Sequence, residues 1–260
     1  MSQTGTTATV ERHILRERDA MLGFGDFGAL FEAYHAHARR LDLPLDPLGT
    51  VMMHQALAGA ALQLSFRVVE ESTAWTLNVH RPAANVFAAG GGPDSTLTGR
   101  YFVDDVETIG ENRLYVQRSH PEREPTRSVL SVDGIDLFEI FQQYFHRSEQ
   151  LAVRFVELSS SEMAAVFALP GADAAWIRGL DGVDVRALRE SSREPIESRT
   201  FTFACTCDGE RVARVLAGMF GEDPEALFQG DASVEARCPR CGALWSVDRE
   251  AFDRALDRLR

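Results

Sequence analysis

The sequence from Phe203 to Trp245 begins F-A-C-T-C and, after a further thirty residues, ends C-P-R-C-G-A-L-W. It holds all four cysteines of the chain, which are Cys205, Cys207, Cys238 and Cys241, and the 204 residues before them contain none. Zinc prefers a tetrahedral site of this kind, with four thiolate sulfurs about 2.3 Å from the ion. The stretch therefore predicts a small C-terminal lobe, residues 203–260, that binds zinc through four cysteines.

The two cysteine pairs differ in their local chemistry. In C-P-R-C-G, Pro239 stiffens the turn and Gly242 can adopt a positive φ, so successive backbone amides can point at the sulfurs. In C-T-C, Cys205 and Cys207 can share a metal or close a small strained disulfide ring, and strained disulfides are the labile kind. Three interpretations are open: a structural zinc site, a thiol switch that binds zinc when reduced and forms two disulfides when oxidised, and two permanent disulfides.

The composition limits the class of protein. The chain has 260 residues, 45% of them hydrophobic, which suffices for a full core and a small appended domain. No run approaches the ~20 apolar residues of a membrane span, and no apolar segment with a cleavage site opens the chain. Net charge is −12, and all 27 basic residues are arginine. Because phosphate binding needs a basic face, we expect no nucleic-acid partner. The lack of a long apolar run predicts no membrane partner.

The first part of the chain predicts strands around two helices. Residues 10–15 form a strand, and the glycines of L-G-F-G-D-F-G are expected to break regular structure before a helix over residues 27–40 that Asp26 caps. Residues 48–69 have the length and apolar stripe of a buried helix. His35 and His37 lie two apart on the first helix, point to different sides and so do not form a metal pair.

Residues 72–130 change to a strand period. Trp75, Leu77 and Val79 alternate with polar residues, and further strands are predicted at 84–89, 95–103, 113–117 and 127–130. An aromatic-rich helix follows a cap at Asp133 or Asp136, and two more strands, 152–158 and 163–169, close this part. The order predicts an α+β fold: a core of mostly antiparallel sheet with packed helices, residues 1–171, that should fold without metal.

Residues 172–202 are rich in charged residues and serine and have only a weak apolar period, so they are predicted to be a linker with a marginal helix. In the lobe, Asp208 is expected to cap a helix over residues 210–220. The apolar face of this helix is expected to point into the lobe, and it consists of Val212, Val215, Leu216 and Met219. A strand over residues 234–237 then leads to Cys238.

A resemblance covers most of the chain. The motif Y-F-x-x-S-E-Q-L at Tyr144–Leu151, with C-x-C at Cys205 and C-P-x-C-G at Cys238, resembles the heat shock protein 33 family, the redox-regulated bacterial chaperonin. The strands, the long helix, the S-E-Q-L corner and the cysteine lobe follow the order of that family. The chain is thus identified as a divergent member with a short linker.

The resemblance implies a cytoplasmic holdase that binds unfolding client proteins without ATP. In the reduced state, one zinc ion would be held by the matching cysteines, Cys205, Cys207, Cys238 and Cys241. Oxidation would form the disulfides Cys205–Cys207 and Cys238–Cys241, release the metal and unfold the lobe. The oxidised form would be a homodimer that exposes apolar surface to clients.

Two other classes of function compete with this one. The first is a zinc-stapled module that binds a particular protein and has no redox switch. The second is an enzyme, which is not expected, because four cysteines around one zinc ion leave no open position for a substrate. Ser148 and Glu149 could be read as part of an acid–base pair, but a capped turn or a buried hydrogen bond fits them better.

Overall fold

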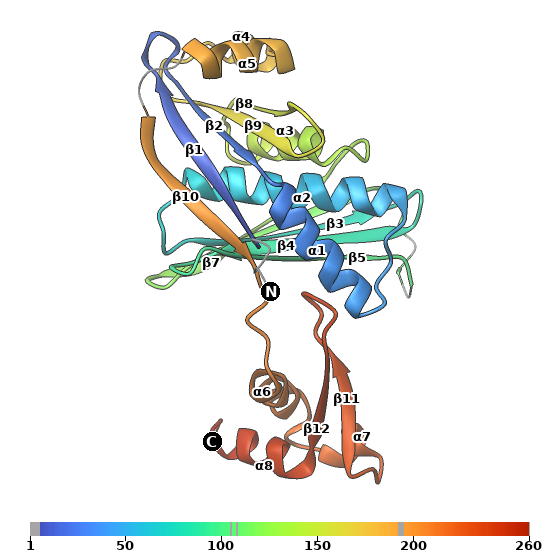
Figure 1. Ribbon diagram of the computed structural model, residues 1–260. Helices are drawn as coiled ribbons and strands as arrows, with labels where there is room; N and C mark the ends of the chain where they lie inside the picture. Colours follow the sequence, from blue (N-terminus) through green and yellow to red (C-terminus); the bar gives the residue numbers. More distant parts are fainter. Residues whose placement is uncertain (1–5, 105, 108, 192–194, 260) are drawn as a thin grey trace, which may run out of the picture. The chain divides into compact units, whose positions relative to one another are not determined.

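The computed structural model describes residues 6–104, 106–107, 109–191 and 195–259. The chain forms two compact units, residues 1–204 and 205–260 (Figure 1). The first unit is a large, mostly antiparallel sheet with packed helices, and the second carries the four cysteines, so the predicted α+β class is confirmed. Within the described ranges, every helix is too short or too polar to cross a bilayer.

The first unit is built on one ten-stranded sheet in the order β7-β6-β3-β4-β5-β10-β1-β2-β9-β8. Its strands are β1 (Thr7–Leu15), β2 (Ala20–Asp26), β3 (Ser72–Val79), β4 (Ala84–Gly91), β5 (Thr96–Phe102), β6 (Arg113–His120), β7 (Arg123–Ser131), β8 (Val153–Glu157), β9 (Glu162–Ala168) and β10 (Pro195–Phe203). Neighbouring strands are antiparallel except β10 and β5, which pair in parallel over two residues.

Four of the five helices of this unit begin at aspartates that accept hydrogen bonds from the first turn, whereas the N-cap residue of the first helix is Phe27 and not the expected Asp26, which accepts from the Gly28 amide. The five helices are α1 (Gly28–Arg40), α2 (Pro47–Ser65), α3 (Leu137–Arg147), α4 (Ala174–Gly179) and α5 (Gly182–Ser191), with a 3₁₀ turn at Arg16–Arg18. Asp46 accepts from the Gly49 amide at 2.7 Å, and Asp136 caps α3 as predicted. A capping side chain satisfies an amide that the helix itself leaves unpaired.

The core of the first unit lies on both faces of the sheet, and the larger cluster extends over both of its halves. On one face, α2 and α3 pack against the strands, and the Trp75 ring lies 4.4 Å from that of Phe141. On the other face, α4 and α5 bury Ile177, Leu180 and Val185 against β2, β8 and β9. Strands covered on both faces need apolar residues at successive positions, as in the M-A-A-V-F of β9.

Strand β2 corrects one prediction, because two of the three glycines expected to break regular structure, Gly23 and Gly25, lie inside it. A Cβ atom at Gly25 would stand 2.6 Å from the Thr9 carbonyl oxygen of β1, and one at Gly23 would stand 2.9 Å from the Phe66 ring. No side chain fits at such distances. The two glycines therefore serve close packing within the sheet and do not interrupt it.

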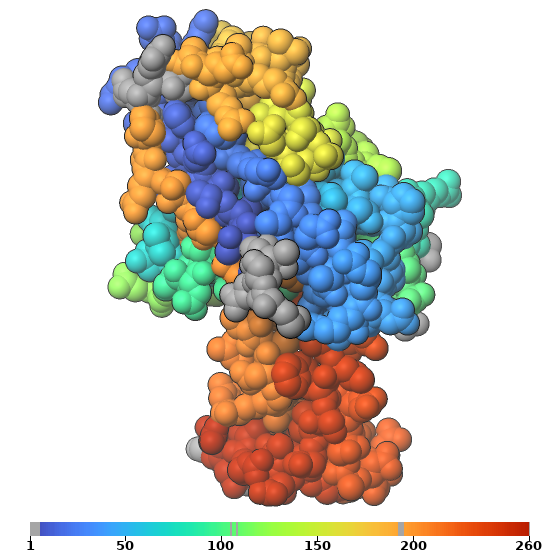
Figure 2. Space-filling view, in the orientation of Figure 1, coloured from blue at the N-terminus to red at the C-terminus, as the bar shows by residue number. Residues whose placement is uncertain are grey.

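Residues 172–202 also differ from the prediction, because they are not a linker between two domains. They form α4, α5 and most of β10, and Figure 2 shows α4 and α5 as part of the surface of the first unit. Strand β10 lies inside the sheet, between β5 and β1. A core ending at residue 171 would lack the strand that joins the two halves of the sheet, so the first unit extends to Ala204.

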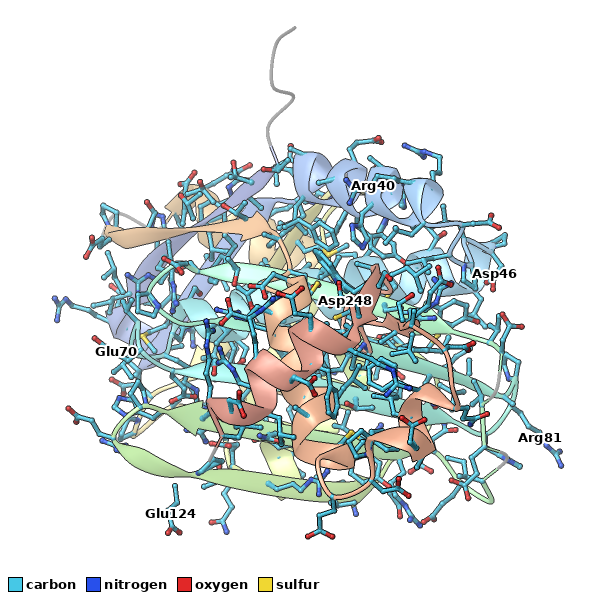
Figure 3. All side chains as sticks on the ribbon, turned by 90° about the horizontal axis from the view of Figure 1, so that it is seen from below. Arg40, Asp46, Glu70, Arg81, Glu124 and Asp248 are labelled. Carbon is cyan, nitrogen blue, oxygen red and sulfur yellow. The ribbon has the colours of Figure 1, made fainter. Side chains whose placement is uncertain are left out.

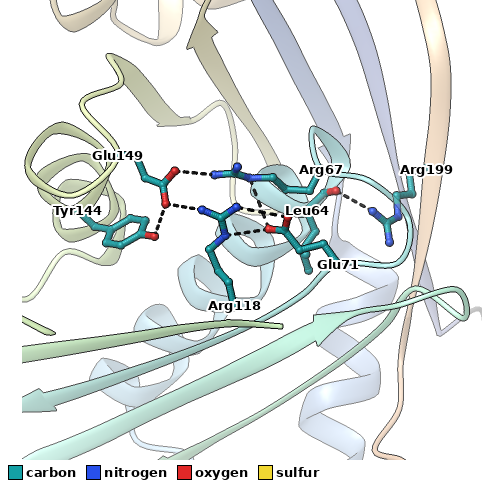
Figure 4. A network of polar contacts seen from close by, with 7 residues as sticks. All are labelled: Leu64, Arg67, Glu71, Arg118, Tyr144, Glu149 and Arg199. Carbon is teal, nitrogen blue, oxygen red and sulfur yellow. Dashed lines mark hydrogen bonds and ion pairs between the residues drawn. The ribbon is translucent and has the colours of Figure 1, made fainter. Parts of the chain in front are cut away.

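Strand β10 is fixed in place by a buried arginine. Arg199 donates to the Leu64 carbonyl at 2.7 Å (Figure 4). It also donates to Ser95 Oγ at 2.9 Å, and its guanidinium lies over the Phe201 ring. A polar sequence such as E-S-R-T can therefore occupy a central strand, because the charged group is satisfied by Ser95 and by backbone carbonyls, one of them at the end of α2.

The second unit packs three helices against a hairpin. Its elements are α6 (Gly209–Phe220), α7 (Pro224–Phe228), β11 (Ser233–Arg237), β12 (Leu244–Asp248) and α8 (Arg249–Asp257). Asp248, labelled in Figure 3, caps α8 by accepting from the Ala251 amide at 2.7 Å. The buried core consists of Ala213, Ala217, Phe228, Val247, Phe252 and Ala255.

The inward face of α6 differs from the predicted one. Ala213 and Ala217 are its buried residues, whereas Val215 and Met219 are 62% and 69% exposed. Val212 and Leu216 are only partly buried. The small alanines face the hairpin and α8, and the larger apolar side chains remain on the surface of the unit.

Candidate metal and redox centre

The second cysteine pair lies at the tip of the β11–β12 hairpin. The Cys238 amide donates to the Ala243 carbonyl at 2.7 Å, and the Gly242 amide donates to the Cys238 carbonyl at 2.9 Å. Gly242 has a φ of +80°, as its place in C-P-R-C-G predicts. The turn folds so that Cys238 and Cys241 are buried on its inner side.

The first cysteine pair lies in the extended segment between β10 and α6. Asp208 follows it and caps α6, accepting from the Arg211 amide at 2.7 Å as predicted. The Arg211 side chain turns back and donates to the Thr206 carbonyl at 2.7 Å. The start of α6 thus holds the backbone between Cys205 and Cys207 in one conformation.

The four predicted residues meet at one point. The sulfurs of Cys205, Cys207, Cys238 and Cys241 all lie within 4.8 Å of one another. The Sγ atoms of Cys207 and Cys241 are 3.5 Å apart. In a tetrahedral zinc site with Zn–S bonds of about 2.3 Å, the sulfurs are about 3.8 Å apart. The spacing therefore fits four ligands of one ion, and all four residues are reduced thiols here.

The four sulfurs lie so close together that thiol protons form hydrogen bonds between them, and these hydrogen bonds shift the pKa values of the cysteines. A hydrogen bond from the Cys241 thiol lowers the pKa of Cys205 to about 4, and the Arg240 guanidinium acts in the same direction. The same hydrogen bond, together with burial, raises the pKa of Cys241, and burial raises the pKa of Cys207. Four thiolates at these distances repel one another, so a divalent cation is the natural replacement for the shared protons.

The donor set is one that zinc accepts. Four soft thiolates in a compact group suit Zn²⁺, and the set is complete, so it leaves no ligand position for a substrate. Two ligands are buried and two are partly exposed to solvent. The arrangement can hold a metal, and because two of its sulfurs are accessible it can also react with small oxidants.

The S-E-Q-L corner holds a second polar cluster, in the first unit (Figure 4). Glu149 Oε1 accepts from Arg118 Nη1 at 2.7 Å and from the Tyr144 hydroxyl at 2.6 Å, and Oε2 accepts from Arg67 at 3.2 Å. Burial raises the pKa of Glu149, but the Tyr144 hydrogen bond and the two arginines outweigh it and leave the pKa below its usual value. The carboxylate thus occupies a buried hydrogen-bond network, one of the two roles predicted for it.

The arginine partners of Glu149 were not predicted, because they come from residues 31 and 82 positions earlier in the chain.

The two histidines of α1, His35 and His37, do not contact each other. His35 Nε2 lies 3.0 Å from His54 Nε2 of α2, whereas His37 Nδ1 contacts Arg40 at 3.1 Å. The pairing between helices has no signal in the sequence.

Comparison with known proteins agrees with the centre and the fold. The family model of the Hsp33 protein matches residues 178–248, which include all four cysteines. The 33 kDa chaperonin of Nitrosococcus oceani is 25% identical over 165 residues, 55% of this chain and 57% of that protein. The 33 kDa chaperonin of Neisseria meningitidis serogroup A is 27% identical over 165 residues, 55% of each. The chain therefore spans little more than half the length of these relatives.

A solved structure resembles the whole chain. The crystal structure of the 33 kDa chaperonin from Thermotoga maritima superposes with a TM-score of 0.70, covers 98% of both chains and shares 16% identity, a level that shows the fold alone. Fold and centre together define a two-unit α+β protein with a closed four-cysteine site in its smaller unit. Residues 178–248 of this chain, with the four cysteines, match the model of the Hsp33 family, and the fold is that of the 33 kDa chaperonin from Thermotoga maritima.

Proposed function

We propose that the protein is a redox-regulated, ATP-independent chaperone that binds unfolding proteins once its cysteines are oxidised and zinc is released. The observation that carries the proposal is the convergence of four thiols within 4.8 Å, two from the first residues of the small unit and two from the tip of its hairpin. The names of the relatives, 33 kDa chaperonin, support the chaperone part. No catalytic role is assigned to any residue.

Zinc would contribute most of the stability of the second unit. The unit has 56 residues, 205–260, and a core of only six fully buried apolar side chains. A domain of this size is marginal by itself, whereas structural zinc contributes ~10 kcal/mol or more to the folding of small domains. The ion joins the segment before α6 to the tip of the hairpin, so loss of the ion should unfold the unit.

Oxidation is the event that would release the ion. The expected products are the disulfides Cys205–Cys207 and Cys238–Cys241. Each forms by transfer of two electrons to one peroxide molecule, which takes up two protons and becomes water. A disulfide sulfur carries no negative charge and is a poor zinc ligand, so both pairs leave the metal together. Unfolding would then expose Phe228, Val247 and Phe252 as apolar surface for clients.

A second candidate is a zinc-stapled module that binds one protein partner without a switch. The favouring observation is an apolar groove of about 310 Å³ beside the centre, lined by Val212, Val215, Leu216 and Pro239 among others. Such a groove would be complete in the zinc-bound state and would need no oxidation. The two candidates therefore differ in which state binds protein.

The deciding experiment follows zinc, thiols and holdase activity together. Protein purified under reducing conditions should contain one zinc ion and four thiols per chain and should not suppress aggregation of an unfolded client. After peroxide and mild heat, zinc and thiols should both be lost, and suppression should appear. Zinc that is retained together with unreactive thiols would favour the zinc-stapled module. Suppression of aggregation before oxidation would show that no redox switch controls client binding.

Sedimentation of the reduced and oxidised protein tests the expected oxidised homodimer, and cell fractionation tests the expected cytoplasmic location.

A further inference from the structure

A pocket of about 220 Å³ lies beside β8, the strand at one edge of the sheet. Helix α3 packs against one face of this strand and α4 against the other (Figure 1). Gln142 of α3, Arg154 of β8 and Arg178 of α4 are among the residues that line the pocket. Polar side chains from three elements therefore meet at one small cavity.

Backbone hydrogen bonds orient two of these side chains. The Phe155 amide of the edge strand donates to Gln142 Oε1 at 2.9 Å, so the side-chain NH₂ group of Gln142 is left as a donor. Arg154 Nε donates to the Leu180 carbonyl at 2.8 Å, and within the described part of the chain both terminal nitrogens of its guanidinium are left for another acceptor. Both residues therefore offer N–H donors to the pocket that they line.

The positive charge beside this pocket is not balanced by a carboxylate. Among residues 6–104, 106–107, 109–191 and 195–259, no carboxylate oxygen lies within 4.0 Å of the guanidinium nitrogens of Arg154 or Arg178, and no acidic side chain lines the pocket. Arg154 also borders a neighbouring cavity that contains Glu157 and Asp181, but it does not pair with either of them. In a chain of net charge −12, two such arginines beside one cavity are a local exception to the composition.

We propose that this pocket is a binding site for a phosphate group, carried by inorganic phosphate or by a short phosphate monoester. The forked guanidinium groups of Arg154 and Arg178 match the oxygens of a phosphate, and the NH₂ group of Gln142 can donate to a further oxygen. A phosphate dianion also balances two positive charges, whereas a carboxylate balances one. The volume lies below the roughly 300–1,000 Å³ of pockets for drug-sized ligands, which limits the ligand to a phosphate with a short carbon chain.

A bound phosphate would join the three elements around the edge strand. The first unit would gain stability, because a ligand that binds only the folded chain shifts the unfolding equilibrium toward the folded state. The site lies entirely in the first unit and uses none of the four cysteines. It therefore does not depend on the proposed function, and either can fail without the other.

An NMR titration of the full chain with inorganic phosphate, at constant ionic strength, tests the site. The signals of the Gln142 side-chain NH₂ group and of the Arg154 Nε–H should shift and saturate. Arg178→Gln should weaken phosphate binding about tenfold or more, because it removes a charged donor from the ligand. Arg178 is exposed, so its replacement should leave the fold intact. The matched control is Arg186→Gln, which removes the same charge from an exposed position on α5 and should bind phosphate as the wild type does.

Two further ligands define the chemistry of the site. Acetate, a monoanion, should bind more weakly than phosphate, and glycerol phosphate distinguishes the two forms of the ligand. Tighter binding of glycerol phosphate than of inorganic phosphate identifies a monoester, and equal or weaker binding identifies inorganic phosphate. The proposal is overturned if neither signal saturates, if Arg178→Gln and Arg186→Gln bind phosphate equally, or if acetate binds as tightly as phosphate.

Discussion

Glu149 and Arg118 form an ion pair of 2.7 Å between Oε1 and Nη1, and it fixes the corner between α3 and β8 onto strand β6. Arg118 also pairs with Glu71 at 3.0 Å, so its charge is shared by two carboxylates. The side chains of Glu149 and Arg118 are 19% and 27% exposed. The pair is therefore protected from solvent enough to contribute to stability, unlike an ordinary surface pair.

Glu149→Gln should destabilise the first unit. The substitution keeps the size of the side chain but leaves Arg67 and Arg118 with one carboxylate, Glu71. Breaking a fully buried pair costs about 3–5 kcal/mol, and partial exposure reduces the expected loss to about 1–2 kcal/mol. Urea unfolding of zinc-loaded protein, followed by circular dichroism, measures the loss.

The matched control is Glu111→Gln. Glu111 also accepts from an arginine, Arg113 at 3.1 Å, but both groups lie on the surface. Its unfolding midpoint should equal that of the wild type. If the two glutamine variants are equally stable, the Glu149 network does not hold the corner.

His54 should make the first unit less stable in acid. Its ring stacks on Phe31 at 3.9 Å, and its Nε2 lies 3.0 Å from that of His35, a contact that needs at least one neutral ring. Burial, with a contribution from the charge of His35, lowers the pKa of His54 from 6.5 to about 4. Between these values the unfolded chain binds the proton and the folded chain does not, so stability falls as pH falls from 6.5 to 4.

His54→Gln should flatten this dependence. Urea unfolding of the wild type and the variant at a series of pH values gives the two slopes. His146→Gln, at an exposed position on α3, serves as the control and should keep the slope of the wild type. A slope that survives in His54→Gln would assign the acid sensitivity to other groups.

Cys205→Ser should weaken zinc binding and abolish the response to peroxide together. The serine hydroxyl is not a thiolate at neutral pH, so the set loses one ligand and its partner in the expected disulfide. The loss of affinity should exceed the roughly 10–100-fold cost of an outer-shell change. Zinc content after dialysis against a chelator measures it, with Thr206→Ser as the control between the two cysteines. A variant that keeps zinc and still responds would remove Cys205 from the centre.

A fragment of residues 1–204 should fold without metal, whereas a fragment of residues 1–171 should not. The shorter fragment lacks α4, α5 and β10, and so loses the cover of the second core cluster and the strand between β5 and β1. Proteolysis and circular dichroism of both fragments compare them. A folded, monomeric 1–171 fragment would show that β10 is dispensable.

Local chemistry explains what the sequence could predict. The caps at Asp136 and Asp208, the turn at Gly242 and the meeting of the four cysteines depend on neighbours within a few residues or on a well-defined metal geometry. Strand and helix periods then follow from burial on one face. These features carry their own signal in the sequence.

The parts that were missed depend on distant partners. Gly25 looks like an interruption until the Thr9 carbonyl is placed 2.6 Å from where its side chain would be. The polar β10 looks like a linker until Arg199 reaches the Leu64 carbonyl, 135 positions earlier. In α6, the apolar pattern favoured Val215, but the tight approach of α8 selects alanine. Each case is decided by tertiary contacts that no local pattern contains.

The place of β10 also constrains how the protein is made. Ribosomes add about 5–20 residues per second, N-terminal residues first. Until residues 195–203 leave the ribosome, β5 and β1 each present an unpaired edge, because β10 is the strand that both of them pair with. Open strand edges are templates for aggregation. A protein proposed to bind unfolding chains is therefore itself prone to aggregation until the last strand of its sheet has been synthesised.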